Sequence, residues 1–213
     1  MTLQRGLVFF GIGLMVATVF GLFRNGKTRL SVVFTIYITL ATIFTILIVG
    51  FPLRYTPEAF MIKQGIYDTL FMCMALELSI KVFAAFRGVA TRVRAFLALA
   101  VIASTVAIFV LTPQNLTYSD LARYQPEITT TVVWCLSFVA LLIVWYQIPV
   151  PAFTRAILLG FIPYQMVFVI YTDLIGRLGW GALPGLNLLN TVAYDAVAAY
   201  WAYAAWRKDE VIT

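Results

Sequence analysis

An acidic residue in the middle of the last apolar stretch is the side chain in this sequence best placed to do chemistry. Asp195 lies within residues 186–206 (LNLLNTVAYDAVAAYWAYAAW), a run long enough to cross a bilayer. On a helix it shares a face with the small side chains of Thr191, Ala198, Ala199 and Ala202. Another helix can come close to such a face, so the carboxyl should point into protein rather than into lipid. Because an intramembrane carboxyl is energetically unfavourable, Asp195 is a candidate functional residue.

The sequence offers Asp195 no cationic partner at its depth, so we expect its carboxyl to be mostly protonated at neutral pH. A threonine of the second apolar stretch is one expected hydrogen-bond partner. The other is the carbonyl of Leu159, which loses its helical donor to Pro163. Two interpretations stay open: a neutral bond between helices, and a proton-exchanging site.

Beyond Lys63 at its start, the third apolar stretch carries three charged residues. Glu77 precedes Lys81 by four residues, which is the favoured order for an ion pair on a helix. A lone charge in hydrocarbon costs about 2.5–3.5 kcal/mol on insertion scales, so we expect these two residues to pair. Asp68 lies on the opposite face of this helix, where it could meet water at the outer end or serve as a further coupling acid of a transporter.

Uncharged polar residues mark two other stretches. Thr35, Thr39 and Thr42 fall within one arc of the second stretch, where they could line a polar groove or, as we favour, pack against another helix. Gln165 follows Pro163 in the sixth stretch and could line the same path.

Small residues predict where helices approach each other closely. Gly13, Ala17 and Gly21 recur every fourth residue in the first stretch, and Ala198 and Ala202 flank Asp195 in the last. We expect the first set to pack inside the bundle, with a homodimer face as the alternative.

The sequence contains no histidine, which excludes histidine-ligated haem and imidazole-ligated metal. Its two cysteines, Cys73 and Cys135, lie in apolar stretches and are expected to be small buried hydrophobes. Microbial rhodopsins carry a retinal-binding lysine four residues after the aspartate of the last helix, where this chain has Ala199. We therefore predict no metal and no cofactor.

Composition places these residues in a membrane. The chain is 62% hydrophobic and 11% charged, with a mean hydropathy of +0.95, and its apolar residues form runs of about 20. This pattern predicts a single all-α domain, a bundle of seven transmembrane helices in contact with lipid. The expected spans are residues 7–23, 30–51, 62–86, 95–111, 128–146, 153–171 and 186–206.

The basic residues predict the orientation of the bundle. Ten of the 15 Lys and Arg residues fall on the side of the loop at residues 24–29 and of the C-terminus, and five fall on the other side. The positive-inside rule then predicts an outside N-terminus and a cytoplasmic C-terminus in a bacterial inner membrane. Because the net charge of +6 is explained by the span ends, nucleic acid is not an expected partner. The two longer loops, residues 112–127 and 172–185, are expected outside, the second as a turn along the interface.

The third stretch (YDTLFMCMALELSIKVFAAF) and the last (LNTVAYDAVAAYWAYAAW) give the chain a loose resemblance to a group of small uncharacterised bacterial seven-helix membrane proteins. The resemblance implies the helix plan and carries no residue role.

Three functions remain open at this point. The favoured one is a non-enzymatic accessory subunit or sensor that acts through other membrane subunits or as a homo-oligomer, since the sequence has no nucleotide-binding loop and no catalytic pair. The alternative is a small-molecule or proton-coupled transporter using Asp195 and Glu77. The third is an intramembrane enzyme acting on lipid, which needs acids that converge near one interface.

Overall fold

The computed structural model describes residues 3–51, 56–84, 118–178 and 183–208, and all regular structure in these segments is helical. The helices are α1 (Leu3–Arg24), the short 3-10 helix η1 (Lys27–Arg29), α2 (Val32–Gly50), α3 (Pro57–Phe83), α5 (Tyr118–Trp145), α6 (Ala152–Leu178) and α7 (Leu183–Trp206). The expected all-helical fold is confirmed. Within the described residues, the three helical segments Leu3–Arg24, Val32–Gly50 and Ala152–Tyr171 are long and apolar enough to cross a membrane. The expected span at residues 95–111 lies outside the described residues.

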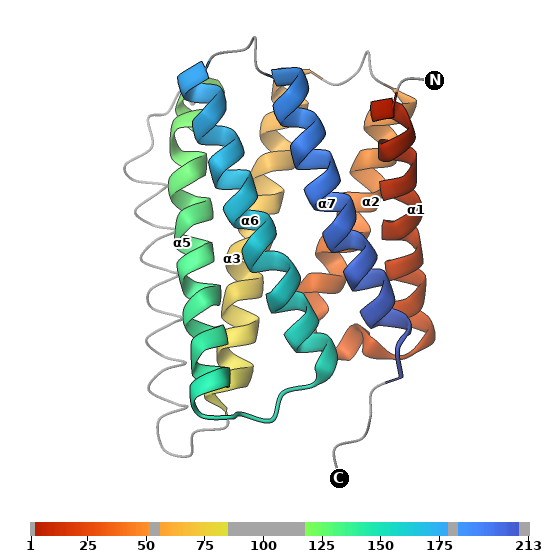
Figure 1. Ribbon diagram of the computed structural model, residues 1–213, viewed down its shortest axis with the longest axis vertical. Helices are drawn as coiled ribbons and strands as arrows, with labels where there is room; N and C mark the ends of the chain where they lie inside the picture. Colours follow the sequence, from red (N-terminus) through yellow and green to blue (C-terminus); the bar gives the residue numbers. More distant parts are fainter. Residues whose placement is uncertain (1–2, 52–55, 85–117, 179–182, 209–213) are drawn as a thin grey trace.

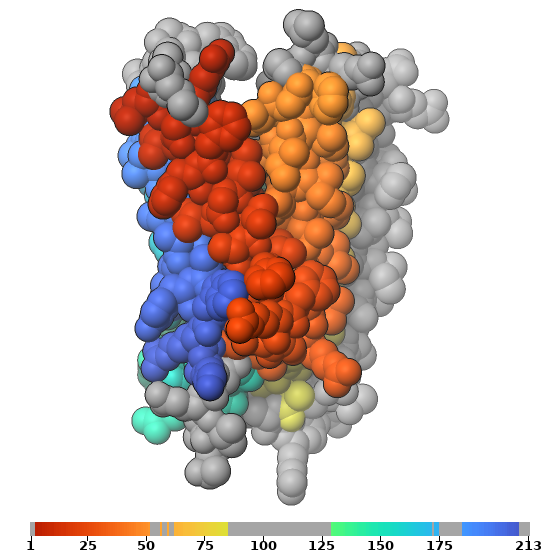
Figure 2. Space-filling view, turned by 90° about the vertical axis from the view of Figure 1, so that its right-hand side faces the viewer, coloured from red at the N-terminus to blue at the C-terminus, as the bar shows by residue number. Residues whose placement is uncertain are grey.

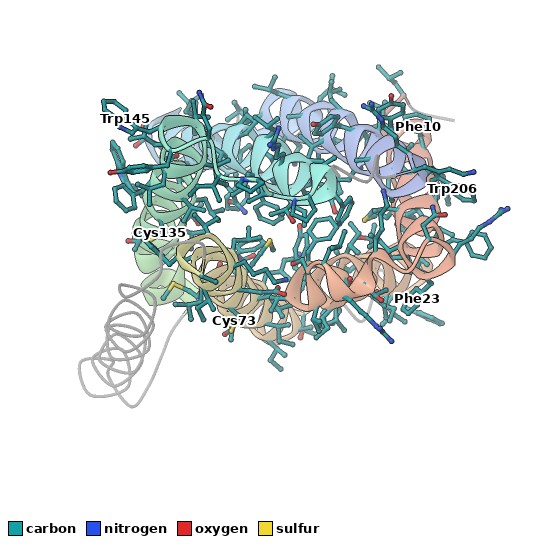
Figure 3. All side chains as sticks on the ribbon, turned by 90° about the horizontal axis from the view of Figure 1, so that it is seen from below. Phe10, Phe23, Cys73, Cys135, Trp145 and Trp206 are labelled. Atoms are coloured by element: carbon teal, nitrogen blue, oxygen red, sulfur yellow. The ribbon has the colours of Figure 1, made fainter. Side chains whose placement is uncertain are left out.

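The six long helices form a closed ring (Figures 1 and 3). In order around the ring, α1 packs on α2, then come α3, α5, α6 and α7, and α7 returns to α1. We call the end where α1 begins the upper end, as drawn in Figure 1, and the end where α1 turns into α2 the lower end. Because chain direction alternates, α2 and α6 finish at the upper end, whereas α3 and α7 begin there.

Capping residues set several helix boundaries. Ser31 is the N-cap of α2, and its hydroxyl accepts a hydrogen bond from the Phe34 amide at 3.3 Å. Thr56 caps α3 in the same way, followed by Pro57, whose fixed φ suits a first helical turn. Gly26 has a φ of 64°, and this left-handed conformation allows the tight turn from α1 into η1.

Several helix boundaries differ from those expected, and three of them change the extent of the loops. Helix α5 begins at Tyr118 rather than at residue 128, α6 continues to Leu178 rather than ending at 171, and α7 begins at Leu183. The expected loops 112–127 and 172–185 are therefore partly helical. A hydropathy pattern detects only the apolar part of a helix, so polar helical turns beyond it are missed.

The contact between α1 and α7 uses a different face of α1 from the one expected. Gly13 is exposed, and a Cβ added there would meet no atom within 4 Å. The buried face carries Gly11 and Met15, and it continues to Gly21, where an added Cβ would lie 2.9 Å from the Trp206 ring. Ala17 takes part through its carbonyl, which accepts a hydrogen bond from Trp206 Nε1 at 3.0 Å. Because α1 is apolar on all sides, the spacing of its small residues alone does not decide which face packs against α7.

The outside of the ring is apolar. Phe10, Phe23 and Trp145 lie on the perimeter (Figure 3) and are 57%, 62% and 76% exposed. Cys135 is also exposed there, and Cys73 is only partly buried, so the expectation that both cysteines are buried was wrong. In a protein surrounded by lipid an apolar residue has no reason to face inward, which removes the usual signal for burial.

Candidate functional site

A cavity of about 280 Å³ lies in the upper half of the ring, enclosed by α1, α2, α3, α6 and α7. Each helix contributes residues from the part nearest the upper end, such as Val8 of α1 and Ile48 of α2. Figure 2 shows the surface hollowed between α1 and α2 at this end. The volume is close to the lower limit of about 300 Å³ for small-molecule sites.

Buried polar atoms without partners converge on this cavity. Asp195 is 6% exposed and Gln165 is 1% exposed, and both line the cavity wall. Among the described residues, no hydrogen-bond partner is present for Asp195 Oδ2, for either amide atom of Gln165, or for Oδ1 of Asn190, which lines the cavity beside them. A buried polar atom without a partner is destabilising by about 1–3 kcal/mol, so this concentration of such atoms makes the cavity the candidate site.

Asp195 reaches the cavity because α1 lacks a side chain opposite it. A Cβ added at Gly11 would lie 2.3 Å from Asp195 Oδ1, so only glycine leaves room for the carboxyl. Ala198 and Ala202 are 0% and 8% exposed on the same helix face, as expected for small residues that admit a neighbouring helix.

Among the described residues, Asp195 forms no hydrogen bond with its expected partners, a threonine of α2 or the carbonyl of Leu159. The hydroxyls of Thr35, Thr39 and Thr42 donate to the carbonyls of Ser31, Thr35 and Ile38, four residues back on their own helix. None of the three lines the cavity, whose α2 wall is made by Tyr37, Ala41, Thr45 and Ile48. In an apolar surrounding a threonine satisfies its hydroxyl on the preceding turn, so the threonine arc marks helix packing.

Tyrosines form much of the remaining wall. Tyr37, Tyr67, Tyr164 and Tyr194 line the cavity, and the last two rings meet edge to face at 5.2 Å between centroids. Lys63 lies at the same wall with its Nζ 5.7 Å from the centroid of the Tyr67 ring. No cation was expected near Asp195 from the sequence, yet Lys63 borders the same cavity.

An aromatic cluster closes the ring below the cavity. Trp201 is fully buried, with its ring 5.2 Å from that of Phe161 and 5.0 Å from that of Phe34. Its Nε1 donates to the carbonyl of Ala156 at 3.1 Å. Tyr37 and Phe71 belong to both regions, since they line the cavity and their rings meet that of Phe161 edge to face. We call Phe34, Tyr37, Phe71, Phe153, Phe161 and Trp201 the aromatic plug.

Of the two alternatives left open for Asp68, contact with water at the outer end is not observed. Asp68 is 7% exposed, and Gln64, a cavity-lining residue, donates to its Oδ1 at 3.0 Å. Its Oδ2 has no partner among the described residues. The ring of helices buries the face of α3 on which Asp68 lies, and the sequence did not reveal this arrangement.

Glu77 belongs to a separate polar cluster at the lower end. It forms the expected ion pair with Lys81, at 2.7 Å between Oε1 and Nζ. Glu77 also accepts hydrogen bonds from Ser31 Oγ at 2.8 Å and from the amides of Val32 and Val33 at 3.0 and 3.1 Å. Its carboxylate thus accepts from backbone amides at the start of α2 that have no partner within the helix. Glu77 is a structural residue here, and the structure does not bring it to Asp195.

Lys27 binds the C-terminal end of α7 at the lower end of the ring. It is 3% exposed, and its ammonium donates to the carbonyls of Ala204 and Arg207 at the end of α7. Asn25 donates to the neighbouring carbonyl of Ala205 at 2.9 Å. A cation at a helix C-terminus is favourable, so the turn between α1 and α2 holds the lower end together.

Several residues of the site were missed in the sequence. Asn190, Gln64 and the four cavity tyrosines were not singled out, although Asn190, Thr191, Tyr194 and Asp195 recur on one helix face. In the described segments no three His, Cys, Asp or Glu side chains gather where they could hold a metal ion.

The chain was also compared with known proteins. No protein family matches it, no curated protein is similar to it, and no solved structure resembles it at a meaningful level.

Proposed function

We propose that this chain is a seven-span protein of a bacterial inner membrane that binds a small molecule in the cavity at its upper end. In this proposal it is a non-enzymatic sensor or accessory subunit, which reports occupancy of the cavity to a partner subunit. The observation that carries the proposal is the presence of two buried polar side chains, Asp195 and Gln165, without partners in a cavity of about 280 Å³.

The surface supports placement in a membrane. Trp134 and Val144 of α5 are 72% and 75% exposed, and Phe20 of α1 is 58% exposed. Large apolar side chains on the whole perimeter of a helical ring are unfavourable in water and favourable in lipid. This argument extends the proposed spans to α3, α5 and α7, which surround the same interior.

Charge supports an orientation with the cavity outside. The lower end carries Arg24, Lys27, Arg29, Lys81, Arg155, Arg207 and Lys208. Arg5, Lys63, Arg123 and Arg177 lie toward the upper end. The positive-inside rule places the lower end in the cytoplasm, so the cavity would receive its ligand from the outer side.

The residues below the cavity favour a sensor over a transporter, because they obstruct movement of a solute along the ring axis. A solute moving down the ring axis would meet the aromatic plug and then the cluster around Glu77 and Lys27. Phe34, Phe161 and Trp201 are fully buried, so a path there requires the plug to separate. Ligand contact with Tyr37 and Phe71, which belong to both cavity and plug, offers a route for a signal to the lower end.

A transporter is the second candidate, and one observation favours it. Asp195 is a buried acid inside a cavity on the side of the ring that would face outward, as expected of a coupling residue. The two candidates differ in whether the ligand crosses the membrane. Uptake of bound ligand into vesicles containing the purified protein would favour the transporter, and binding without uptake supports the sensor.

The proposed function is tested by filling the cavity. The purified protein in mild detergent is heated with a panel of small amines, carboxylates and neutral alcohols, and a ligand is detected as a rise in Tm. Thr45→Phe should abolish that rise, because Thr45 lines the cavity. Ile46→Phe is the matched control, since Ile46 is 47% exposed on the outside of the same helix. A panel in which no compound raises Tm, or an equal rise in both variants, would contradict the proposal.

A further inference from the structure

We infer that the cavity binds an organic ammonium ion, a small molecule with a charged amine and an apolar or aromatic body. The inference rests on the proposed function, because it names the ligand class of the same cavity.

The unpartnered atoms define what the ligand must supply. Oδ2 of Asp195, Oδ1 of Asn190 and one atom of the Gln165 amide are hydrogen-bond acceptors, whereas the other Gln165 amide atom is the only donor in this group. Oδ2 of Asp68, behind Gln64, adds a fourth acceptor next to the wall. A site with excess acceptors is satisfied by a group rich in donors, and an ammonium group offers up to three.

The lack of an ion pair at Asp195 points the same way. Asp195 has no ion-pair partner among the described residues, and the carboxylate of a buried aspartate is stabilised by a cation that arrives with the ligand. The ammonium would then supply the ionic partner that the last helix lacks in its own sequence.

The aromatic walls suit both ends of such a ligand. The rings of Tyr37, Tyr164 and Tyr194 have electron-rich faces that attract cations. The structure already places one cation against a ring of this wall, since Lys63 Nζ lies 5.7 Å from the centroid of Tyr67. Phe71 and Phe168 offer apolar surface for the body of the ligand.

The test compares three probes with the same phenyl body: phenethylammonium, phenethyl alcohol and hydrocinnamate. Binding to the full chain in detergent is measured by titration calorimetry. We expect phenethylammonium to bind at least about tenfold more tightly than the alcohol, because charge-assisted hydrogen bonds are the stronger ones. Asp195→Asn should weaken phenethylammonium binding by about tenfold or more and change alcohol binding by less than about threefold.

Two variants keep this comparison interpretable. Asp173→Asn removes an exposed acid near the end of α6 and should leave the binding of all three probes unchanged. Gln165→Met removes another acceptor with little change of size, and it replaces Asp195→Asn if that variant does not fold. Gln165→Met should also weaken phenethylammonium binding more than alcohol binding.

The outcomes separate this inference from the proposed function. Tighter binding of hydrocinnamate, or equal binding of amine and alcohol, would overturn the ammonium inference and leave a small-molecule site in place. Failure of all three probes would overturn the ammonium inference as well, while the wider panel with Thr45→Phe decides the proposed function. Unchanged phenethylammonium binding in both Asp195→Asn and Gln165→Met would place that ligand elsewhere.

Discussion

The carboxyl of Asp195 lies directly against the backbone of Gly11, so that a Cβ at Gly11 would come within 2.3 Å of Asp195 Oδ1. This contact joins the first helix of the chain to the last. It also allows the Asp195 side chain to face the cavity, because Gly11 leaves space on α1 for the carboxyl. Gly11 and Asp195 are therefore expected to depend on each other.

Gly11→Ala should destabilise the protein by about 1–3 kcal/mol, because the added methyl overlaps the Asp195 carboxyl. The free energy of unfolding in detergent measures the effect. Gly13→Ala is the matched control on the same helix, and we expect it to be neutral or to stabilise by up to about 1 kcal/mol. The double variant Gly11→Ala with Asp195→Ala should lose less free energy of unfolding than the two single variants lose together. Additive losses would show that the two residues are not in contact.

Glu77 and Lys81 form the second coupled pair. Glu77→Gln should destabilise the protein by about 1–3 kcal/mol, because it removes the charge that accepts from Lys81, Ser31 and the first amides of α2. The double variant Glu77→Gln with Lys81→Met should lose less free energy of unfolding than the two single variants lose together, as measured by the same unfolding experiment. Arg155→Met, which removes an exposed cation at the same end, should have little effect. A large effect of Arg155→Met would mean that net charge, rather than this pair, stabilises the lower end.

The helices were predictable because their signals are local. Apolar runs and the spacing of Glu77 and Lys81 each act within a few residues, and the described helices and the ion pair agree with both. The cavity was not predictable in the same way. Asp195 could be singled out as an acid among alanines, but its surroundings depend on which helices become neighbours around the ring.

The errors have the same origin. Thr35, Thr39 and Thr42 left a polar groove open as an alternative to helix packing, and only the structure shows that each satisfies its hydroxyl within its own helix. Gly13 and Gly11 differ by two positions on an apolar helix, and only the position of α7 decides which one must lack a side chain. Asn190 and the tyrosines gained significance only when the ring brought their helices together.

The orientation of the chain can be tested with cysteine labelling. In a background with Cys73→Ala and Cys135→Ala, Gln4→Cys should react with an impermeant thiol reagent added to intact cells, because Gln4 is exposed at the upper end. Lys208→Cys, exposed at the lower end, should react only after the cells are made permeable. The opposite pattern would reverse the proposed orientation and place the cavity on the cytoplasmic side.

The most direct test of the account is whether the cavity can be reached from outside. Thr191 lines the cavity beside Asp195, and Thr191→Cys changes its size little. In the same cysteine-free background, a methanethiosulfonate reagent with a fixed positive charge is added to intact cells, and labelling is followed with time. Thr42→Cys, buried on α2 outside the cavity, is the control. We predict that Thr191→Cys is labelled in intact cells, that Thr42→Cys is not, and that Thr45→Phe blocks the labelling of Thr191→Cys. Absence of labelling at Thr191→Cys, or labelling only in permeable cells, would contradict an outward-facing binding cavity.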